Sequence, residues 1–140
     1  MSGSIFSIVG SALNAQDARM GAIASNLANV DSITPPGGVP YRAHEVVFEA
    51  APIAGANAAL TPALGVNVAG TVETNAAPVQ TYDPGSPFAN AKGYVTGSNV
   101  SQVAQMVDLI DSSDSYSASI AVLQQASRID QQMLSSFQVS

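Results

Sequence analysis

The fold of this chain is constrained most by apolar residues that recur along both of its ends, and at its N-terminal end they recur every three or four positions. In the first thirty residues, the only polar side chain at such a position is Gln16. This spacing over more than three repeats predicts an amphipathic helix that packs along a partner helix. The predicted seam of the helix comprises Phe6, Val9, Leu13, Met20, Ile23, Leu27 and Val30.

The C-terminal segment predicts the partner helix. No proline or glycine occurs from residue 100 to residue 140, so nothing in this run breaks a helix. Ser98 or Asn99 can cap its first turn, and Gln102 stands where a capping box needs an amide. The predicted seam comprises Val103, Met106, Ile110, Tyr116, Ile120, Leu123, Ile129, Met133 and Phe137.

Between the helices, the composition shifts to small residues, prolines and β-branched residues. Strand-like pieces bounded by turn residues occur at HEVVFEA, GVNVAGTVET and PVQTYDP, and the stretch of about 52–64 predicts a flexible loop. We therefore expect a mainly α chain with a small β-rich insert, in which the two helices pair as a coiled-coil-like domain. The expected parts are an N-terminal helix in 1–31, a linker and β-rich domain in 32–97, and a C-terminal helix in 98–140.

The two apolar stripes are longer than one chain can cover. Each predicted helix offers more apolar length than its partner and the insert can bury, so neighbouring copies are expected to supply the rest. Charged residues make up only 10% of the chain, against about 25% in a typical soluble protein. A surface so poor in charge is typical of a protein that lies against other protein. The seam residues are therefore predicted to form subunit interfaces.

Composition also argues against several classes of function. The net charge is −6 and the four cations are spread along the chain, so nucleic acid is not an expected partner. The chain has no cysteine and a single histidine, His44, and it has no nucleophile or phosphate-binding motif. Neither an enzyme nor a cofactor-binding protein is expected.

Three aspartates in the predicted C-terminal helix raise the question of a metal site. Asp108, Asp111 and Asp114 recur every three residues, but they lack the glycine and the closing glutamate of a calcium loop. A solvated acidic face is therefore favoured over a metal site.

The N-terminal residues lack a basic region, and no run of about 18 apolar residues occurs. We expect neither a cleavable signal peptide nor a membrane-spanning helix.

The end of the first helix carries unusual polar and rigid residues. Asn29 is interpreted as a helix cap, whereas Asn26 lies inside the helical pattern and favours a hydrogen bond to another element or subunit. The three prolines in 35–40 predict a stiff exit from the helix, with an ordinary surface loop as the alternative. Tyr41 and Arg42 then offer a stacking face and a fork of donors.

These residues also carry a family resemblance. The chain resembles the bacterial flagellar rod and hook proteins in SALNAQDARMGAIASNLANVDS and in PYRAHEVVF. In that family an Asn-x-Ala-Asn element leads quickly into Pro-Gly-Tyr. Asn26 and Asn29 match the first element, and Pro40, Tyr41 and Arg42 match the second after a longer loop. The longer loop points to the proximal rod members of the family.

The resemblance continues through GVNVAGTVET, PVQTYDPGSPFANAKGYV and SNVSQVAQMVDLIDSSDSYSASIAVL, so it covers nearly the whole chain outside the loop near 52–64. It departs at three positions, where Ser86, Ser98 and Gln105 stand in place of the common histidine, proline and glutamate. The other residues that match the family motif are Tyr82, Asp83, Pro84, Gly93, Tyr94 and Asn99.

The resemblance implies a structural subunit of the proximal rod of the flagellar basal body. Such subunits would polymerise with one another and with other rod proteins into a hollow shaft that crosses the periplasm, transmits torque and forms an export channel. Implied partners also include the basal-body complex at the rod base and the flagellar export apparatus. Two alternatives are another axial subunit of the same family, and a helical adaptor or export cargo that never polymerises.

Overall fold

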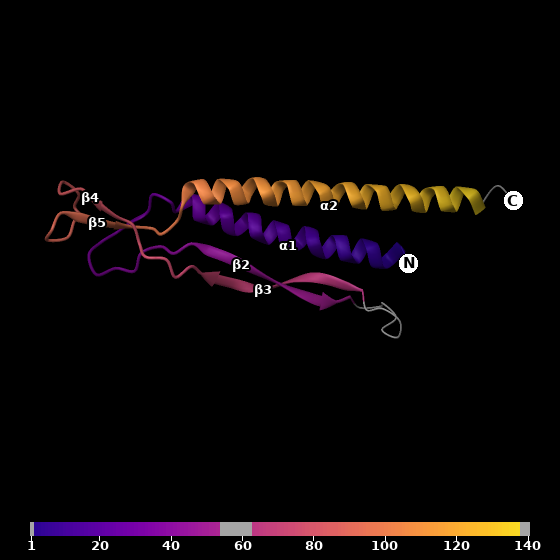
Figure 1. Ribbon diagram of the computed structural model, residues 1–140, viewed down its shortest axis with the longest axis horizontal. Coiled ribbons are helices and arrows are strands. Elements are labelled where there is room, and N and C mark those ends of the chain that lie inside the picture. Colours follow the sequence, from indigo (N-terminus) through magenta and orange to yellow (C-terminus); the bar gives the residue numbers. More distant parts are fainter. Residues whose placement is uncertain (1, 54–62, 138–140) are drawn as a thin grey trace.

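The computed structural model describes residues 2–53 and 63–137 and shows a molecule built in three parallel layers (Figure 1). Two long helices lie side by side, a β-hairpin runs along the N-terminal helix, and a small sheet lies at one end. The expected architecture of long terminal helices around a β-rich centre is confirmed. The elements are α1 (Ser2–Ala28), β1 (Ile33–Thr34), β2 (His44–Pro52), β3 (Leu64–Glu73), β4 (Gln80–Tyr82), β5 (Tyr94–Gly97) and α2 (Gln102–Phe137).

The two helices differ in length. Helix α1 has 27 residues and α2 has 36, which correspond to about 40 Å and about 54 Å at 1.5 Å per residue. In Figure 1 the C-terminal end of α2 extends beyond the N-terminal end of α1. The last turns of α2 therefore have no α1 beside them.

The start of α2 corrects one prediction. The hydroxyl of Ser101 accepts a hydrogen bond of 3.4 Å from the Ala104 amide, which makes Ser101 the capping residue. Ser98 and Asn99 do not cap the helix, because their side chains bind the carbonyl oxygens of Val30 and of the segment 74–76 instead.

The face that α2 turns toward α1 is mostly small and polar. Gln105 and Ser112 are the buried residues of α2, and Ser112 is fully buried. The Ser112 hydroxyl donates a 2.7 Å hydrogen bond to the Asp108 carbonyl oxygen of its own helix, so burial leaves it satisfied. From α1 the buried residues are Val9, Ala15, Ile23 and Asn26.

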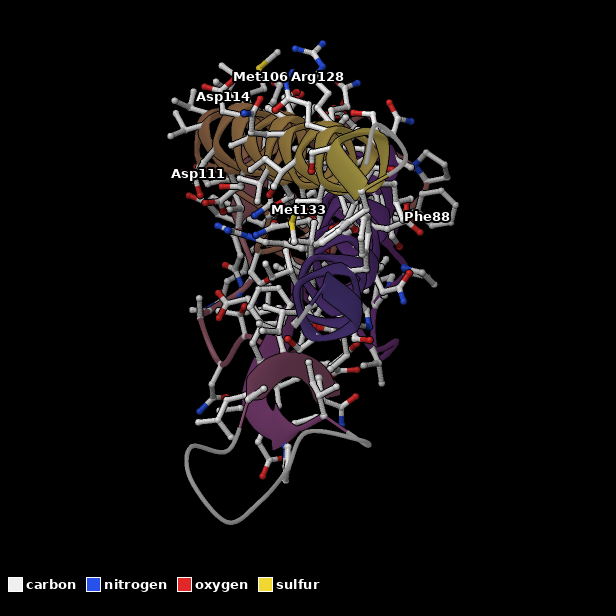
Figure 2. All side chains as sticks on the ribbon, turned by 90° about the vertical axis from the view of Figure 1, so that its right-hand side faces the viewer. Phe88, Met106, Asp111, Asp114, Arg128 and Met133 are labelled. Carbon is white, nitrogen blue, oxygen red and sulfur yellow. The ribbon has the colours of Figure 1, made fainter. Side chains whose placement is uncertain are left out.

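The apolar residues of α2 that were expected to form one stripe lie on different sides of the helix. Tyr116, Ile120 and Leu123 are half-buried, whereas Val103, Met106 and Ile110 are exposed. The expectation that this last group packs along α1 within one chain is wrong. The reason is the six-residue step from Ile110 to Tyr116, which turns the series by about 240° at roughly 100° per residue. Figure 2 shows Met106 on the side of α2 away from α1.

Strands β2 and β3 form an antiparallel hairpin whose register pairs His44 with Glu73 and Pro52 with Leu64, with a bulge between Val47 and Phe48. The two strand-like pieces predicted here are confirmed. The loop predicted at about 52–64 is wrong at both of its ends, because the hairpin pairing continues through Pro52 and Leu64. The rest of that prediction, over 54–62, lies outside the described residues.

The hairpin is fastened to α1 at two places. Near one end, the Asn26 side chain binds the backbone of His44. Near the other end, the Ser11 hydroxyl accepts a 3.0 Å hydrogen bond from the Val66 amide, and a Cβ at Gly65 would lie 2.7 Å from the same hydroxyl. The fifteen residues from Ser11 to Asn26 span about 22 Å of helix, and six or seven strand residues at about 3.3 Å each span the same length.

The remaining strands form a three-stranded antiparallel sheet in the order β1-β5-β4. The predicted piece PVQTYDP contains β4, whereas β1 and β5 were not predicted as strands. The tip between β4 and β5 contains Gly93 with φ of 81°, where an added Cβ would lie 2.8 Å from the Tyr82 ring. Only glycine fits this position without strain.

We expect Gly93→Ala to destabilise this sheet by about 1–2 kcal/mol, because alanine disfavours the left-handed backbone and meets the Tyr82 ring. Thermal unfolding should show a lower melting temperature, and amide exchange should show reduced protection of β4 and β5. Gly85→Ala is the matched control, since its nearest neighbour would be 3.7 Å away. Equal melting temperatures for the two variants would contradict this account.

Candidate functional site

The helices and the hairpin meet at the side chain of Asn26, which is fully buried. Its Oδ1 accepts hydrogen bonds from the His44 amide (2.8 Å) and the Tyr41 hydroxyl (3.1 Å). Its Nδ2 donates to the His44 carbonyl oxygen (2.9 Å) and to Gln105 Oε1 (2.8 Å). The amide thus pairs with one residue of β2 as a neighbouring strand would, and it joins α1 to α2 at the same point. The predicted bond from Asn26 to another element is confirmed.

Two aromatic rings extend this polar junction toward the surface. The Tyr41 hydroxyl lies 3.0 Å from His44 Nδ1 and 3.1 Å from the Ser25 hydroxyl. The Tyr41 and His44 rings are tilted against each other with centroids 5.3 Å apart. His44, the only histidine, is therefore engaged in the contact that holds the linker against α1.

Asn99 makes a second clamp just before α2. Its Oδ1 accepts a 2.7 Å hydrogen bond from the Ala43 amide, and its Nδ2 donates to the carbonyl oxygens of Thr74 (3.1 Å) and Ala76 (3.0 Å). One side chain thereby holds the residues that precede β2 and follow β3, at the open end of the hairpin, beside the start of α2. Together, four residues make up what we call the polar junction: Asn26, Tyr41, His44 and Asn99.

An ion-pair cluster links the helices next to the junction. Arg19 lies 3.4 Å from Asp108 and 3.1 Å from Asp111, and all three side chains are partly exposed. Pairs this exposed contribute little to stability, and they connect the facing sides of α1 and α2. A cleft of about 410 Å³ opens here between the two helices and β2. Within the described residues, no group of acidic or histidine side chains is placed to hold a metal ion.

The other motif residues near α1 make local contacts. Asn29 Nδ2 donates a 2.9 Å hydrogen bond to the Ser25 carbonyl oxygen, which confirms its interpretation as a helix-terminal residue. Arg42 donates a 3.4 Å hydrogen bond to Asn75 Oδ1. Pro35 and Pro36 are exposed and lead into a turn at Gly37, whose φ is 84°.

The motif residues of the β4–β5 tip form an exposed aromatic group. The Tyr82 and Tyr94 rings meet edge to face with centroids 5.3 Å apart. Phe88 is also exposed, and Figure 2 shows it projecting to one side of the molecule. The Asp83 amide donates to the Gly93 carbonyl oxygen over 2.9 Å and closes the tip. Pro84 lies in the same turn, where its Cβ is 3.3 Å from the position of an added Gly93 Cβ.

Two groups of apolar side chains on α2 are left uncovered within one chain. The first, the outer patch, lies near the start of α2 on the side away from α1 and consists of Val103, Met106, Val107 and Ile110, which are 52–74% exposed. The second, the overhang, consists of Met133, Leu134 and Phe137 at the end of α2, which are 53–77% exposed. Val107 and Leu134 were not predicted, because they lie outside the single apolar series of α2.

The structure places the rest of the predicted seam as follows. Ile129 is 47% exposed, so it also lacks full cover within one chain. On α1, Val9 and Ile23 are buried. The half-buried members in or just after α1 are Phe6, Leu13, Met20, Leu27 and Val30.

Comparison with known proteins agrees with the family resemblance. Residues 7–35 match a family model described as flagella basal body rod protein, and residues 91–136 match one described as flagellar basal body rod FlgEFG protein C-terminal. These two ranges contain Asn26, Asn99 and both uncovered groups except for Phe137.

Whole-chain relatives point the same way. Flagellar basal-body rod protein FlgC of Escherichia coli O6:H1 is 48% identical over 119 residues, 85% of this chain and 85% of that protein. FlgC of Salmonella typhimurium is 47% identical over the same shares of both chains. FlgC of Buchnera aphidicola subsp. Acyrthosiphon pisum is 40% identical over 124 residues, which are 87% of this chain and 88% of that protein.

We expect Asn26→Leu to lower the free energy of unfolding by about 2–4 kcal/mol, because leucine fits the space but leaves the His44 amide and carbonyl without partners. The melting temperature should fall by roughly 5–15 °C in a chain of this size. Asn29→Leu is the matched control, since the Asn29 side chain makes one bond within its own helix region. A melting temperature for Asn26→Leu equal to that of the control would show that the junction does not hold the layers together.

Proposed function

Because this chain belongs to the FlgC family of flagellar basal-body rod proteins, we propose that its copies form part of the proximal rod. The chain is a structural subunit. In this proposal it assembles with its own copies, with other rod proteins and with the complex at the rod base. Together these subunits make a hollow shaft that crosses the periplasm, transmits motor torque and leaves a channel for export.

The observation that carries this proposal is the uncovered apolar surface of a charge-poor chain. The outer patch and the overhang expose seven large apolar or methionine side chains on one helix, while charged residues make up 10% of the sequence. Surfaces of this kind mark contacts with other protein. A helical adaptor that never polymerises would be expected to carry charged outward faces instead.

The three-layer build supports the transmission of torque. A shaft needs subunits whose layers do not slide, and packed interiors leave side chains little room to move. Here the polar junction ties α1, α2 and β2 together at one point, and Ser11 ties β3 to α1 about 22 Å away. We propose that this double attachment keeps each subunit rigid when its neighbours twist.

The proposal also covers how the chain leaves the cell and whether it catalyses a reaction. We propose that the chain leaves the cell through the flagellar export apparatus without a cleavable signal, and that it performs no catalysis. His44 supports a structural role, because its ring and its backbone are both engaged in the polar junction. None of the helices in the described part of the chain has both the length and the apolar character needed to cross a membrane.

Deleting the gene for this chain is expected to abolish swimming and to leave no rod in purified basal bodies. Restoring the wild-type gene should restore both, and the chain should be found in the purified structures by mass spectrometry. A deletion strain that swims normally would contradict the proposed function.

Ile110→Asp tests the outer patch separately from folding. Because Ile110 is 64% exposed, the melting temperature of the purified chain should change by no more than about 2 °C, since surface substitutions usually change stability by less than about 0.5 kcal/mol. Swimming should be lost, because the contact would bury an unpaired charge. Ile110→Leu is the control and should swim. Normal swimming of Ile110→Asp would show that the outer patch faces solvent in the assembly.

A further inference from the structure

We propose that the polar junction holds its protons in one fixed pattern, in which His44 carries its proton on Nδ1 and takes up a second proton without breaking a bond of the junction. The junction is then a clamp that tolerates changes of pH, although it contains the only histidine of the chain. Histidine is the side chain that normally changes its charge between about pH 5 and about pH 8. The inference concerns a single subunit and does not depend on the proposed assembly.

The orientation of the Asn26 side chain is fixed by the backbone of His44. The His44 amide is a donor and its carbonyl oxygen is an acceptor, so Oδ1 of Asn26 lies against the first (2.8 Å) and Nδ2 against the second (2.9 Å). The reverse orientation would place donor against donor and acceptor against acceptor. Gln105 follows, because the atom that lies 2.8 Å from Asn26 Nδ2 has to accept a hydrogen bond and is therefore its oxygen.

The hydroxyl of Tyr41 has one proton and three polar neighbours. It lies 3.1 Å from Asn26 Oδ1, 3.1 Å from Ser25 Oγ and 3.0 Å from His44 Nδ1. Asn26 Oδ1 can only accept, so the Tyr41 proton is directed there. If Tyr41 donated to His44 instead, lone pairs of the Tyr41 and Asn26 oxygens would face each other at 3.1 Å. An unmade hydrogen bond of this kind is costly inside a protein.

The other two neighbours of the Tyr41 hydroxyl have to donate to its oxygen. Ser25 supplies its hydroxyl proton, and His44 supplies a proton from Nδ1. This assigns the Nδ1–H tautomer to the neutral imidazole and leaves the lone pair of the ring on Nε2. The tautomer of His44 is thus set by the backbone of the same residue, acting through Asn26 and Tyr41.

A second proton adds to Nε2, because Nδ1 already carries one. Nδ1 remains a donor in the imidazolium ion, so the hydrogen bonds of Tyr41 and Asn26 keep their directions. In the opposite tautomer, Nδ1 would change from acceptor to donor on protonation, and the Tyr41 proton would have to turn away from it. The junction therefore stays closed in both charge states of His44.

Charged groups from three elements line the cleft together with His44. They are Arg19 of α1, Glu45 of β2 and Asp108 of α2. Arg19 is paired with Asp108 and with Asp111, so the carboxylate of Glu45 adds to an excess of negative charge at the cleft. A positive charge on His44 lies beside this excess, and repulsion between like charges does not open the junction.

Nitrogen NMR of the full chain reads the tautomer directly. Because His44 is the only histidine, an untagged sample labelled with nitrogen-15 gives the signals of one imidazole. In a long-range proton–nitrogen correlation spectrum at about pH 8, we expect a protonated Nδ1 and an unprotonated Nε2. When the pH is lowered to about 5, the Nε2 signal should move much further than the Nδ1 signal. A protonated Nε2 at the higher pH, which is the form that predominates for histidine in water, would overturn the proposal.

Two substitutions test whether the junction needs the Nδ1 proton. The amide nitrogen of His44→Asn can take the place of Nδ1, whereas that of His44→Gln can take the place of Nε2. Both variants lose the ring that contacts Tyr41, so each is the matched control of the other. We expect His44→Asn to melt about 3–5 °C above His44→Gln, because it keeps the hydrogen bond to Tyr41. Equal melting temperatures, or a lower one for His44→Asn, would contradict the assigned proton pattern.

The pH dependence of stability separates a tolerant clamp from a switch. His44→Asn has no titrating group at this position, so its melting temperature gives the effect of pH on the rest of the chain. The difference between the wild type and His44→Asn should change by less than about 2 °C between about pH 8 and about pH 5.5. A larger change would show that the charge of His44 alters the stability of the junction, and would overturn the proposal. These measurements use one purified chain, whereas the proposed function fails separately, by normal swimming of the deletion strain.

Discussion

The arrangement of this molecule depends on one buried side-chain amide. The side chain of Asn26 donates two hydrogen bonds and accepts two. Its partners belong to α2, to β2 and to the linker that precedes β2. A buried amide is costly when any of its bonds is missing. The position of α2, the start of the hairpin and the ring of Tyr41 are therefore fixed together, and a change in one requires a change in the others.

Much of the fold was readable from the sequence because helix-forming signals are local. The spacing of Val9, Ile23 and their neighbours, and the long run without proline or glycine, predicted both helices. The position of Asn26 inside a helical pattern predicted a bond to another element, since asparagine is disfavoured there. The hairpin strands followed from their β-branched residues and bounding turns. Strand β1 was missed because two residues are too few to show an alternating pattern, and β5, which has four residues and ends in glycine, was missed as well.

The candidate assembly surface was harder to read. Apolar spacing alone indicated that Val103, Met106 and Ile110 face α1, yet that face belongs to Gln105 and Ser112. Serine gives no hydrophobic signal, and a sequence does not show that its hydroxyl will be satisfied by the Asp108 carbonyl of its own helix. The six-residue step after Ile110 was the available signal, because it breaks the seven-residue repeat and turns the apolar series to the other side of α2.

The stacking of α2, α1 and the β2–β3 hairpin makes the subunit a layered beam (Figures 1 and 2). The resistance of a beam to bending rises steeply with its depth in the plane of bending, provided that its layers are bonded and do not slide. The hydrogen bonds of Asn26 and Ser11 join the hairpin to α1, and the hydrogen bond between Asn26 and Gln105 joins α2 to α1. The molecule is therefore much stiffer within the plane that contains all three layers than at right angles to it. A ring of such subunits would have its flexibility set by how each beam is turned about the common axis.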